Sequence, residues 1–421
     1  LAATGCQDKN AKIPENGIIY LLKHVRAKMD TFSRIRIGIL AAKMWMMDVV
    51  NTVARHLPIK NNRVVFLSNR RDDLTGNFEF VNKYLDQVPD LDRRYVLDSN
   101  EVKHMHLGSL IRMAWYFGNA KVILVDDFCE LFFRMPRRKG TYLIQLWHAC
   151  GAFKTFGCSR MGRPGGQTQQ SKNHRNYDYA LVSSQNIAKF YAEGFGISED
   201  KVAATGIPRT DVFFDKAYKE KVTREFYEKY PQLKDKKIVL FAPTFRGSGN
   251  KTAYYPWEKF SVEKLMRELP QESVLILKNH PFVRDCCEIP EEYQDRVLDL
   301  SREENINDLL FITSVLITDY SSVIFEAVLL NIPILFYTFD LQEYLEKRDL
   351  YFEFAAFAPG KIISDMEALI KAAAGLLDGP TEETSPAMTK TQFQRLFLDA
   401  LDGHSTQRTM QLVEELLATG D

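Results

Sequence analysis

The stretch "KVILVDD", residues 121–127, decides the fold of this chain. Four apolar residues in succession follow Lys121, and two aspartates come directly after them. A short run that is apolar at consecutive positions is typical of a strand buried on both faces, because a half-exposed strand alternates apolar and polar residues. "KVILVDD" therefore predicts a central strand of a parallel sheet that ends in two carboxylates, Asp126 and Asp127.

Runs of the same kind recur in two series, with amphipathic segments of helical length between them. The first series is "RVVFLSN" (63–69), "RYVLDS" (94–99), "KVILVDD", "YLIQLWHA" (142–149), "YALVSS" (179–184) and "KVAATGIP" (201–208). The second is "KKIVLFAPTFR" (236–246), "SVLILKNHP" (273–281), "RVLDLS" (296–301), "SVLITDYSS" (314–322) and "IPILFY" (332–337). The pattern predicts an α/β protein with two doubly wound parallel-sheet domains, 60–207 and 208–375, that face a central cleft. A helical tail, 376–421, follows them.

The N-terminal segment, residues 1–59, predicts an amphipathic helix. Residues 35–53, "IRIGILAAKMWMMDVVNTV", are rich in Ile, Met and Trp. Arg36, Lys43 and Asp48 interrupt the stretch, so we do not expect it to span a membrane. Its composition and basic flanks are typical of a helix lying in an anionic membrane surface, and they also fit a helix packed on the first domain.

Charge is informative in its distribution, because the 421 residues contain 55 basic and 55 acidic side chains. Residues 131–177 contain no acid and nine basic residues: Arg134, Arg137, Arg138, Lys139, Lys154, Arg160, Arg163, Lys172 and Arg175. A solvated surface normally mixes both signs, so this run predicts a face that binds a polyanion. No nucleic-acid recognition motif accompanies it, and we expect no nucleic-acid partner. The six cysteines show no CxxC spacing, which argues against zinc and fits reduced thiols in the cytosol.

Polar clusters follow three strands of the second domain, where ligands of doubly wound sheets bind. They are Lys278, His280 and Arg284 after one strand, Thr244 and Arg246 after another, and Ser321 and Ser322 where a strand turns into a helix. Cationic groups and a helix start together suit a diphosphate, although serines also cap helices and strand-end basic residues are often merely solvated. Glu326, about one turn into the helix, could accept from ribose hydroxyls. Neither GxGxxG nor GxxxxGKS/T occurs, so dinucleotide and NTPase sites are not expected. We predict no metal and no cofactor.

His148 ends the strand in "LIQLWHACGAFKTFG" (143–157) and raises a separate question. If this strand neighbours "KVILVDD", Asp126 or Asp127 can orient the imidazole and leave its other nitrogen free. An imidazole near its reference pKa of about 6.5 suits proton removal at neutral pH. The alternative is a core histidine at a strand end. The adjoining basic run favours a base that acts on a phosphorylated acceptor.

Together these motifs resemble the CDP-glycerol glycerophosphotransferase family of teichoic acid primases and polymerases. The resemblance rests on "QLWHACGAFKTFG" (145–157), "NYDYALVSS" (176–184), "GIPRTD" (206–211), "FAPTFR" (241–246), "KNHP" (278–281) and "TDYSSVIFEA" (318–327). It implies a GT-B fold, a CDP-alcohol donor in the C-terminal domain and peripheral attachment to the inner membrane face. His148 matches the family's presumed base, His280 its second essential histidine, and Thr318, Asp319, Ser321 and Ser322 its donor-binding turn.

The resemblance implies a reaction. His148 would deprotonate a hydroxyl of a lipid-linked glycerol phosphate acceptor, whose oxygen attacks the distal phosphorus of CDP-glycerol while CMP leaves. The acceptor phosphates would lie along the basic loop, at Lys154, Arg160, Arg163, Lys172 and Arg175. Many members have Gly-Thr-Pro-Leu after this histidine, whereas here Ala149 to Phe153 precede Lys154, which we expect to alter the acceptor side.

Alternatives of several classes stay open. Ribitol phosphate transfer from CDP-ribitol would use the same fold, and no residue distinguishes the three-carbon from the five-carbon alcohol. A GT-B glycosyltransferase with a nucleotide-sugar donor would share the serine turn. A degenerate transferase that only docks polyanions would be expected to lack His148 or His280, and both are present.

Overall fold

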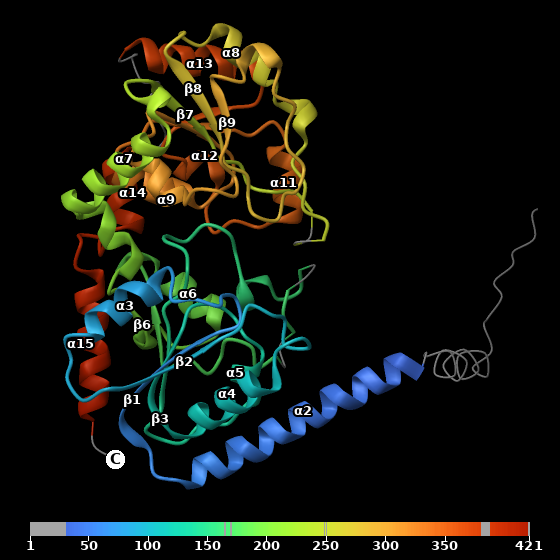
Figure 1. Cartoon of the computed structure of the whole chain (residues 1–421), viewed down its shortest axis with the longest axis vertical. Coiled ribbons are helices and arrows are strands. Elements are labelled where there is room, and N and C mark those ends of the chain that lie inside the picture. The colour runs from blue at the N-terminus through green and yellow to red at the C-terminus, as the bar shows by residue number, and fades with distance from the viewer. Residues whose placement is uncertain are drawn as a thin grey trace, which may run out of the picture.

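The computed structural model describes residues 31–163, 166–168, 171–247, 249, 251–379 and 388–419, with side chains from residue 36 onward. Residues 1–30 of the predicted N-terminal segment lie outside the described residues. The chain folds into two lobes stacked one above the other, each built on a six-stranded parallel sheet (Figure 1). The predicted fold class is confirmed.

The N-terminal lobe has the strand order β2-β1-β3-β4-β5-β6, with every pair parallel. Its strands are β1 (Lys60–Ser68), β2 (Asp92–Leu97), β3 (Ala120–Val125), β4 (Tyr142–Gln145), β5 (Tyr179–Leu181) and β6 (Val202–Ala203). All six residues of β3, the strand of "KVILVDD", are buried, as a strand covered on both faces requires. The order reverses between β1 and β3, which makes that point of the sheet the expected ligand position.

The C-terminal lobe has the order β12-β11-β10-β7-β8-β9, again with every pair parallel. Its strands are β7 (Lys237–Phe241), β8 (Ser273–Leu277), β9 (Val297–Asp299), β10 (Val315–Thr318), β11 (Ile334–Tyr337) and β12 (Lys361–Ile363). Counted from β7, this is the Rossmann order, and its reversal lies between β7 and β10. The loops after β7 and β10 carry "FAPTFR" and "TDYSS", so the predicted donor motifs meet there.

Helices cover both sheets and connect the lobes. Their bounds are α2 (Thr31–His56), α3 (Asn77–Leu85), α4 (Leu107–Asn119), α5 (Leu131–Arg134), α6 (Ala188–Phe195), α7 (Lys216–Lys229), α8 (Val262–Glu268), α9 (Ile306–Leu310), α10 (Val323–Leu329), α11 (Leu341–Lys347), α12 (Phe354–Phe357), α13 (Met366–Asp378), α14 (Lys390–Phe397) and α15 (Ser405–Ala418). The predicted tail returns to the first lobe, where α15 lies against α3 and β3 (Figure 1). Met410, Val413 and Leu416 of α15 are buried there. One continuous apolar cluster runs through both lobes, so their contact is extensive.

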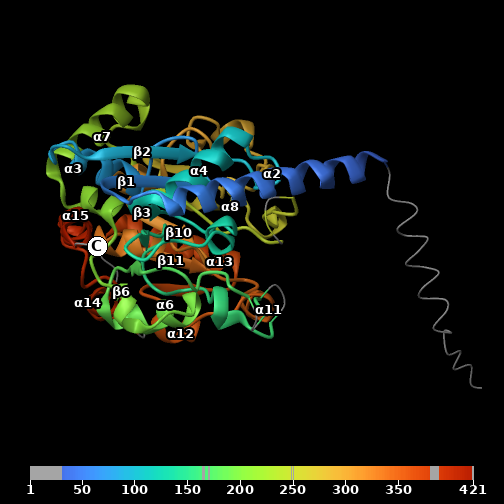
Figure 2. The ribbon, with the colours of Figure 1, turned by 90° about the horizontal axis from the view of Figure 1, so that it is seen from below.

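The long helix α2 is packed over only part of its length. Its C-terminal half lies on α4 through Met47, Asn51 and Ala54, and Asn51 donates to the carbonyl of Ala114. Its N-terminal half projects from the body in both views (Figures 1 and 2). Contrary to our expectation, residues 36–56 are long and apolar enough, by length and composition, to cross a membrane, with a mean hydropathy of 1.3 over the best window. An 18-residue window that excludes Arg36 contains only two charges, Lys43 and Asp48, and they do not lower its hydropathy enough to prevent this.

Candidate active site

His148 lies directly beyond β4, and the adjacent β3 supplies its acidic neighbour. The His148 Nδ1 atom is 3.8 Å from Asp127 Oδ2, and the imidazole is 48% exposed, so half of the ring remains accessible. That separation exceeds a hydrogen bond, and it places the carboxylate where it can orient or stabilise the ring. Asp126 points elsewhere. It is buried against Arg71 at 2.5 Å, and burial raises its pKa. The structure therefore brings only Asp127, of the two predicted aspartates, to the histidine.

The backbone that carries His148 is held from two sides. Trp147 has a φ of 54°, a left-handed conformation that a tryptophan adopts only when its surroundings enforce it. Asn77 of α3 donates its side-chain amide to the Trp147 carbonyl at 2.6 Å, and Gln145 accepts from the Trp147 amide at 2.9 Å. The Trp147 ring lies 4.5 Å from the His148 ring. These contacts fix the position from which the imidazole projects.

Arg209, which we did not single out from the sequence, links this histidine to the other lobe. It belongs to the motif "GIPRTD", and its guanidinium donates to the His148 carbonyl at 3.2 Å and to Glu326 Oε1 at 2.5 Å. The side chains of Arg209 and Glu326 are only 16% and 5% exposed. Glu326 lies in α10 of the C-terminal lobe, so its carboxylate is engaged by arginine. Its predicted ribose contact stays a prediction.

On the donor side, His280 follows β8 and lies between the rings of Phe245 and Phe282. Burial lowers its pKa to about 4, and the nearby ammonium of Lys154 acts in the same direction. The ring is therefore neutral at physiological pH. Its Nδ1 atom accepts from the backbone N–H of Phe282 at 3.2 Å. A neutral ring that accepts at Nδ1 carries its proton on Nε2, which makes His280 a hydrogen-bond donor there.

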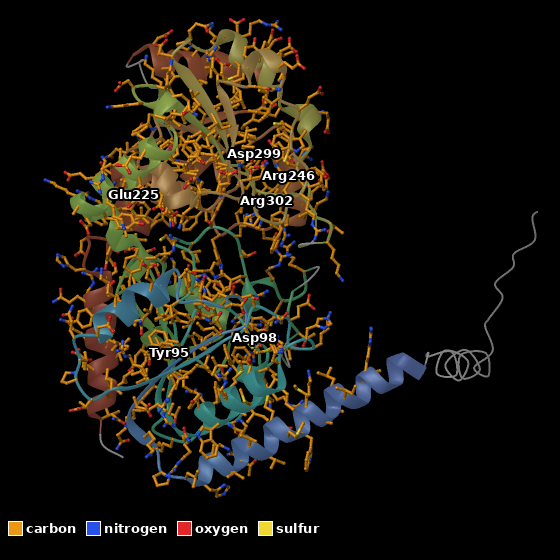
Figure 3. All side chains as sticks on the ribbon, in the orientation of Figure 1. Tyr95, Asp98, Glu225, Arg246, Asp299 and Arg302 are labelled. Atoms are coloured by element: carbon orange, nitrogen blue, oxygen red, sulfur yellow. The ribbon has the colours of Figure 1, made fainter. Side chains whose placement is uncertain are left out.

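Arg246 and Asp319 form the buried centre of the donor motifs. Arg246 donates to Asp319 Oδ2 at 2.9 Å and holds Asp340 with two bonds, of 2.6 and 2.9 Å. Asp319 also accepts from the backbone N–H groups of Thr244 and Tyr320. Figure 3 shows Arg246 in the part of the C-terminal lobe nearer the N-terminal lobe, with Asp299 and Arg302. Two internal carboxylates already occupy the Arg246 guanidinium.

The remaining predicted donor residues differ in accessibility. Thr318 is buried and donates to the Ala242 carbonyl, joining β10 to the loop after β7. Lys278 donates to the carbonyls of Leu300 and Ser301. Ser321 Oγ accepts from the Val323 N–H at the start of α10, and Ser322, like Arg284, is exposed. The hydrogen-bond donors that remain accessible are therefore those of the serine turn, His280 and Arg284.

Lys154, which we expected to bind the acceptor, contacts the C-terminal lobe; its acceptor role stays a prediction. Its Nζ atom donates to Thr244 Oγ1, in the opposite lobe, at 3.4 Å, and its backbone pairs with Leu350. The preceding residues are core, because Phe153 packs on Phe325, Phe354 and Phe357. A Cβ at Gly151 would meet the Phe325 ring at 2.1 Å. This segment packs against the C-terminal lobe, and its expected effect on the acceptor side stays a prediction.

The basic run divides into structural and exposed residues. Arg134 pairs with Asp48 of α2 at 2.6 Å, Arg137 pairs with Asp178, and Arg138 donates to the Leu57 carbonyl. These arginines are already engaged by partners within the N-terminal lobe and α2. Lys172 and Arg175 are exposed, and Arg163 is exposed with Asp349 at 3.6 Å; Arg160 is half-buried. Within the described residues, the exposed cations of the run that have no carboxylate partner are Lys139, Lys172 and Arg175, and these are open to a polyanion.

Hollows open in the surface of the C-terminal lobe. One, of about 1190 Å³, lies between α8, α13 and the ends of β11 and β12, and contains none of the predicted site residues. Another, of about 590 Å³, lies beside Arg246 and α11. Among the residues that the structure describes, no three His, Cys, Asp or Glu side chains are grouped to hold a metal ion. Metal independence stays a prediction.

The fold and the facing strand ends define a GT-B-like protein. Solved structures of the wall teichoic acid polymerase TagF match with a TM-score of 0.73 and 20% identity, covering 96% of this chain and 98% of that chain. A UDP-GlcNAc 2-epimerase from Neisseria meningitidis matches with a TM-score of 0.50 and 14% identity, over 84% of this chain and 99% of that chain. At these identities the matches establish the fold.

Sequence comparison gives the family. The model of the "CDP-Glycerol:Poly(glycerophosphate) glycerophosphotransferase" family matches residues 49–415. The chain belongs to this family, which confirms the resemblance inferred from the motifs.

Individual relatives differ in the polyol that they are named for. A teichoic acid poly(ribitol-phosphate) polymerase of Bacillus spizizenii is 46% identical over 86% of this chain, and the ribitol-phosphate polymerase TarL of Staphylococcus aureus is 43% identical over 74%. A teichoic acid glycerol-phosphate primase of Bacillus subtilis is 31% identical over 79% of this chain and 82% of its own length. The chain spans 57% and 56% of the length of the two ribitol-phosphate polymerases.

Proposed function

We propose that the protein transfers ribitol phosphate from CDP-ribitol to a hydroxyl of a polyol phosphate acceptor, releasing CMP, in teichoic acid synthesis. Family membership supports a CDP-alcohol donor. Relatives of 46% and 43% identity are named ribitol-phosphate polymerases, whereas a glycerol-phosphate relative is 31% identical. The preference for CDP-glycerol that we took from the resemblance therefore gives way to its alternative. The observation that carries the proposal is the half-exposed His148 beside Asp127, on the face that meets the donor lobe.

The chemistry follows from these groups. His148 takes the proton of the attacking hydroxyl as the new oxygen–phosphorus bond forms at the β-phosphorus of the donor. The bond between that phosphorus and the bridging oxygen breaks, and CMP leaves with both electrons. Asp127 stabilises the imidazolium that results. CMP is a stable anion, so donors aimed at its phosphate matter more than a strong acid. His280 Nε2 and the serine turn at the start of α10 supply such donors.

For the acceptor, we propose the exposed part of the basic loop. Lys172 and Arg175 stand free of carboxylate partners within the described residues, and Arg163 lies near the edge of the interlobe face with Asp349. Exposed cations of this kind attract the phosphates of a polyol phosphate chain without requiring one fixed binding geometry. That arrangement suits a growing polymer whose phosphates are equivalent.

A membrane surface would bring a lipid-linked acceptor to the enzyme. Trp45, Val49 and Val53 lie on one face of α2, opposite the buried Met47 and Ala54, and are 66%, 41% and 51% exposed. Such a stripe costs free energy in water and stabilises a helix that lies in the headgroup region. We therefore propose peripheral attachment at the cytoplasmic membrane face through α2.

The donor test compares CDP-ribitol, CDP-glycerol and UDP-sugars with a lipid-linked polyol phosphate acceptor, and measures CMP or UDP release. We expect CMP release from CDP-ribitol at a kcat/KM at least about tenfold above that from CDP-glycerol, with no UDP release. A preference for CDP-glycerol would contradict ribitol phosphate transfer and favour glycerol phosphate transfer. UDP release would indicate a glycosyltransferase. A chelator arm tests metal independence.

The membrane test uses vesicles with about 30% anionic lipid and the full chain. Replacing Trp45 and Val49 with Glu should reduce co-sedimentation about tenfold or more, because the charges oppose insertion. The matched control replaces Leu345 and Ile362, exposed apolar residues of the C-terminal lobe. Equal binding of all three proteins would contradict attachment through α2.

A further inference from the structure

The ammonium of Lys154 lacks an internal counter-ion. Within the described residues, no carboxylate lies within ion-pair distance of its Nζ atom, and its one hydrogen-bond partner is the neutral hydroxyl of Thr244, at 3.4 Å. The carboxylate that acts on it most strongly, Asp319, is already held by Arg246. Removing an ammonium from water without a partner is costly, so proteins rarely leave one in that state unless a ligand completes it.

The surroundings of Lys154 belong to the donor lobe. Thr244 and Arg246 follow β7, Asp319 follows β10, His280 follows β8, and Tyr344 and Arg348 come from α11 and its end. Five groups set the local charge. Lys154, Arg246 and Arg348 are cations, whereas Asp319 and Asp340 are the carboxylates bound to Arg246. One positive charge is left over. A group with negative charge is needed to balance it.

We propose that Lys154, although it belongs to the N-terminal lobe, binds the diphosphate of the CDP-alcohol donor and not the acceptor. This inference rests on the proposed function. A diphosphate held between His280 Nε2 and the serine turn offers non-bridging oxygens to an ammonium that contacts Thr244. The backbone pairing of Lys154 with Leu350 keeps the side chain on the donor side. Because the two contacts come from different lobes, a bound donor fastens one lobe to the other.

The protonation state of Lys154 should make donor affinity depend on pH. Burial lowers the pKa of the Lys154 ammonium to about 8, opposed by Asp319. A bound diphosphate favours the charged form, so donor affinity should fall as the pH rises above about 8. The facing groups do not mimic this change: His280 is neutral, the pKa of Tyr344 lies above its ordinary value, and Arg246 stays charged. Asp319 is an acid held beside Arg246. The donor carries two phosphodiester-like charges that do not titrate in this range.

The experiment measures CDP-ribitol and CDP-glycerol binding by calorimetry at about pH 7 and about pH 9.5. The proteins are wild type, Lys154→Met, Lys154→Arg and the matched control Lys172→Met. Lys154→Met should weaken donor binding about 10- to 100-fold at the lower pH, as expected for one charge-assisted hydrogen bond, and should abolish the pH dependence. Lys154→Arg should retain part of the affinity at both pH values. Lys172→Met should leave donor binding within about twofold and raise the acceptor KM.

Each outcome decides a different point. If Lys154→Met binds the donor as tightly as the wild type and has a raised acceptor KM, this inference alone is overturned. Lys154 then returns to the acceptor set. No binding of either CDP-alcohol to the wild type overturns the proposed function together with it. The melting temperature of ligand-free Lys154→Met checks folding. It should not fall, because the substitution removes an unbalanced charge and keeps the apolar stem.

Discussion

The ion pair between Arg209 and Glu326 predicts a large loss of stability when one partner is removed. The two atoms that form it are 2.5 Å apart, and the two side chains are 16% and 5% exposed. Arg209 also donates its backbone N–H to Asn77 and its guanidinium to the His148 carbonyl. Glu326→Ala leaves this buried guanidinium uncompensated. Breaking a buried pair in this way typically costs about 3–5 kcal/mol of folding free energy.

The assay is urea unfolding of the wild type, Glu326→Ala, Arg209→Met and the double variant. We expect each single variant to lose about 3–5 kcal/mol, and the double variant to lose less than the sum, because it leaves no unpaired charge. The control is Glu343→Ala in α11, whose exposed pair with Lys347 should contribute less than about 1 kcal/mol. A loss below about 1 kcal/mol for Glu326→Ala, or strictly additive losses, would contradict the interpretation that this ion pair stabilises the contact between the lobes.

A further variant, Glu326→Gln, tests the competing role of Glu326. If its carboxylate binds the ribose of the donor, Glu326→Gln should weaken CDP-ribitol binding while the free energy of unfolding hardly changes. If it acts through Arg209, Glu326→Gln should lower kcat more than donor affinity, because the His148 carbonyl loses a fixed partner. In this second case the free energy of unfolding should also fall, because a neutral amide cannot balance the buried guanidinium of Arg209, and this loss distinguishes the two roles.

Three further predictions concern the base, pH and salt. His148→Ala should lower kcat about 10²- to 10⁴-fold in a CMP-release assay with little change in donor KM, and near-wild-type turnover would exclude it as the base. Burial lowers the pKa of His174 to about 4, so on acidification the unfolded chain takes up a proton before the folded chain does. The free energy of unfolding should therefore fall as the pH drops from about 6.5 toward 4. In urea titrations His174→Gln should reduce that loss by about 2 kcal/mol, and an unchanged loss would contradict the role of His174. Acceptor KM should rise with salt more steeply than donor KM, and Lys172→Met should flatten that slope; equal sensitivity of both substrates would remove the basic loop from acceptor binding.

The strands could be predicted from the sequence because burial on both faces leaves a local signal. In "KVILVDD", burial of all six residues of β3 requires consecutive apolar side chains, including the stem of Lys121. The proximity of His148 to Asp127 could also be predicted, because each residue follows its strand and β3 and β4 are adjacent and parallel. Chain order and strand adjacency were sufficient there.

The pairing of charges could not be predicted, because it depends on residues far apart in the chain. Residues 131–177 contain no acid, yet Arg134 and Arg137 bind Asp48 and Asp178, which lie outside that run. Arg246 and Asp340 are separated by 94 positions. A run that is free of acids in sequence can be surrounded by acids in space, so its sign alone does not identify a polyanion surface.

This difference gives a physical criterion for ligand contacts at the interlobe face. Arg246 and Arg209 have the charge and position of phosphate ligands, but each is satisfied by buried carboxylates and would have to break those pairs to bind a substrate. Lys154 lies within the electrostatic cluster of Arg246 and has no carboxylate partner among the described residues. The free energy available to an incoming anion is therefore greatest at the lysine, although all three residues follow strands and carry the same charge. Counter-ion assignment, which depends on the folded chain, separates the two arginines that are paired inside the protein from the lysine that we propose for the donor.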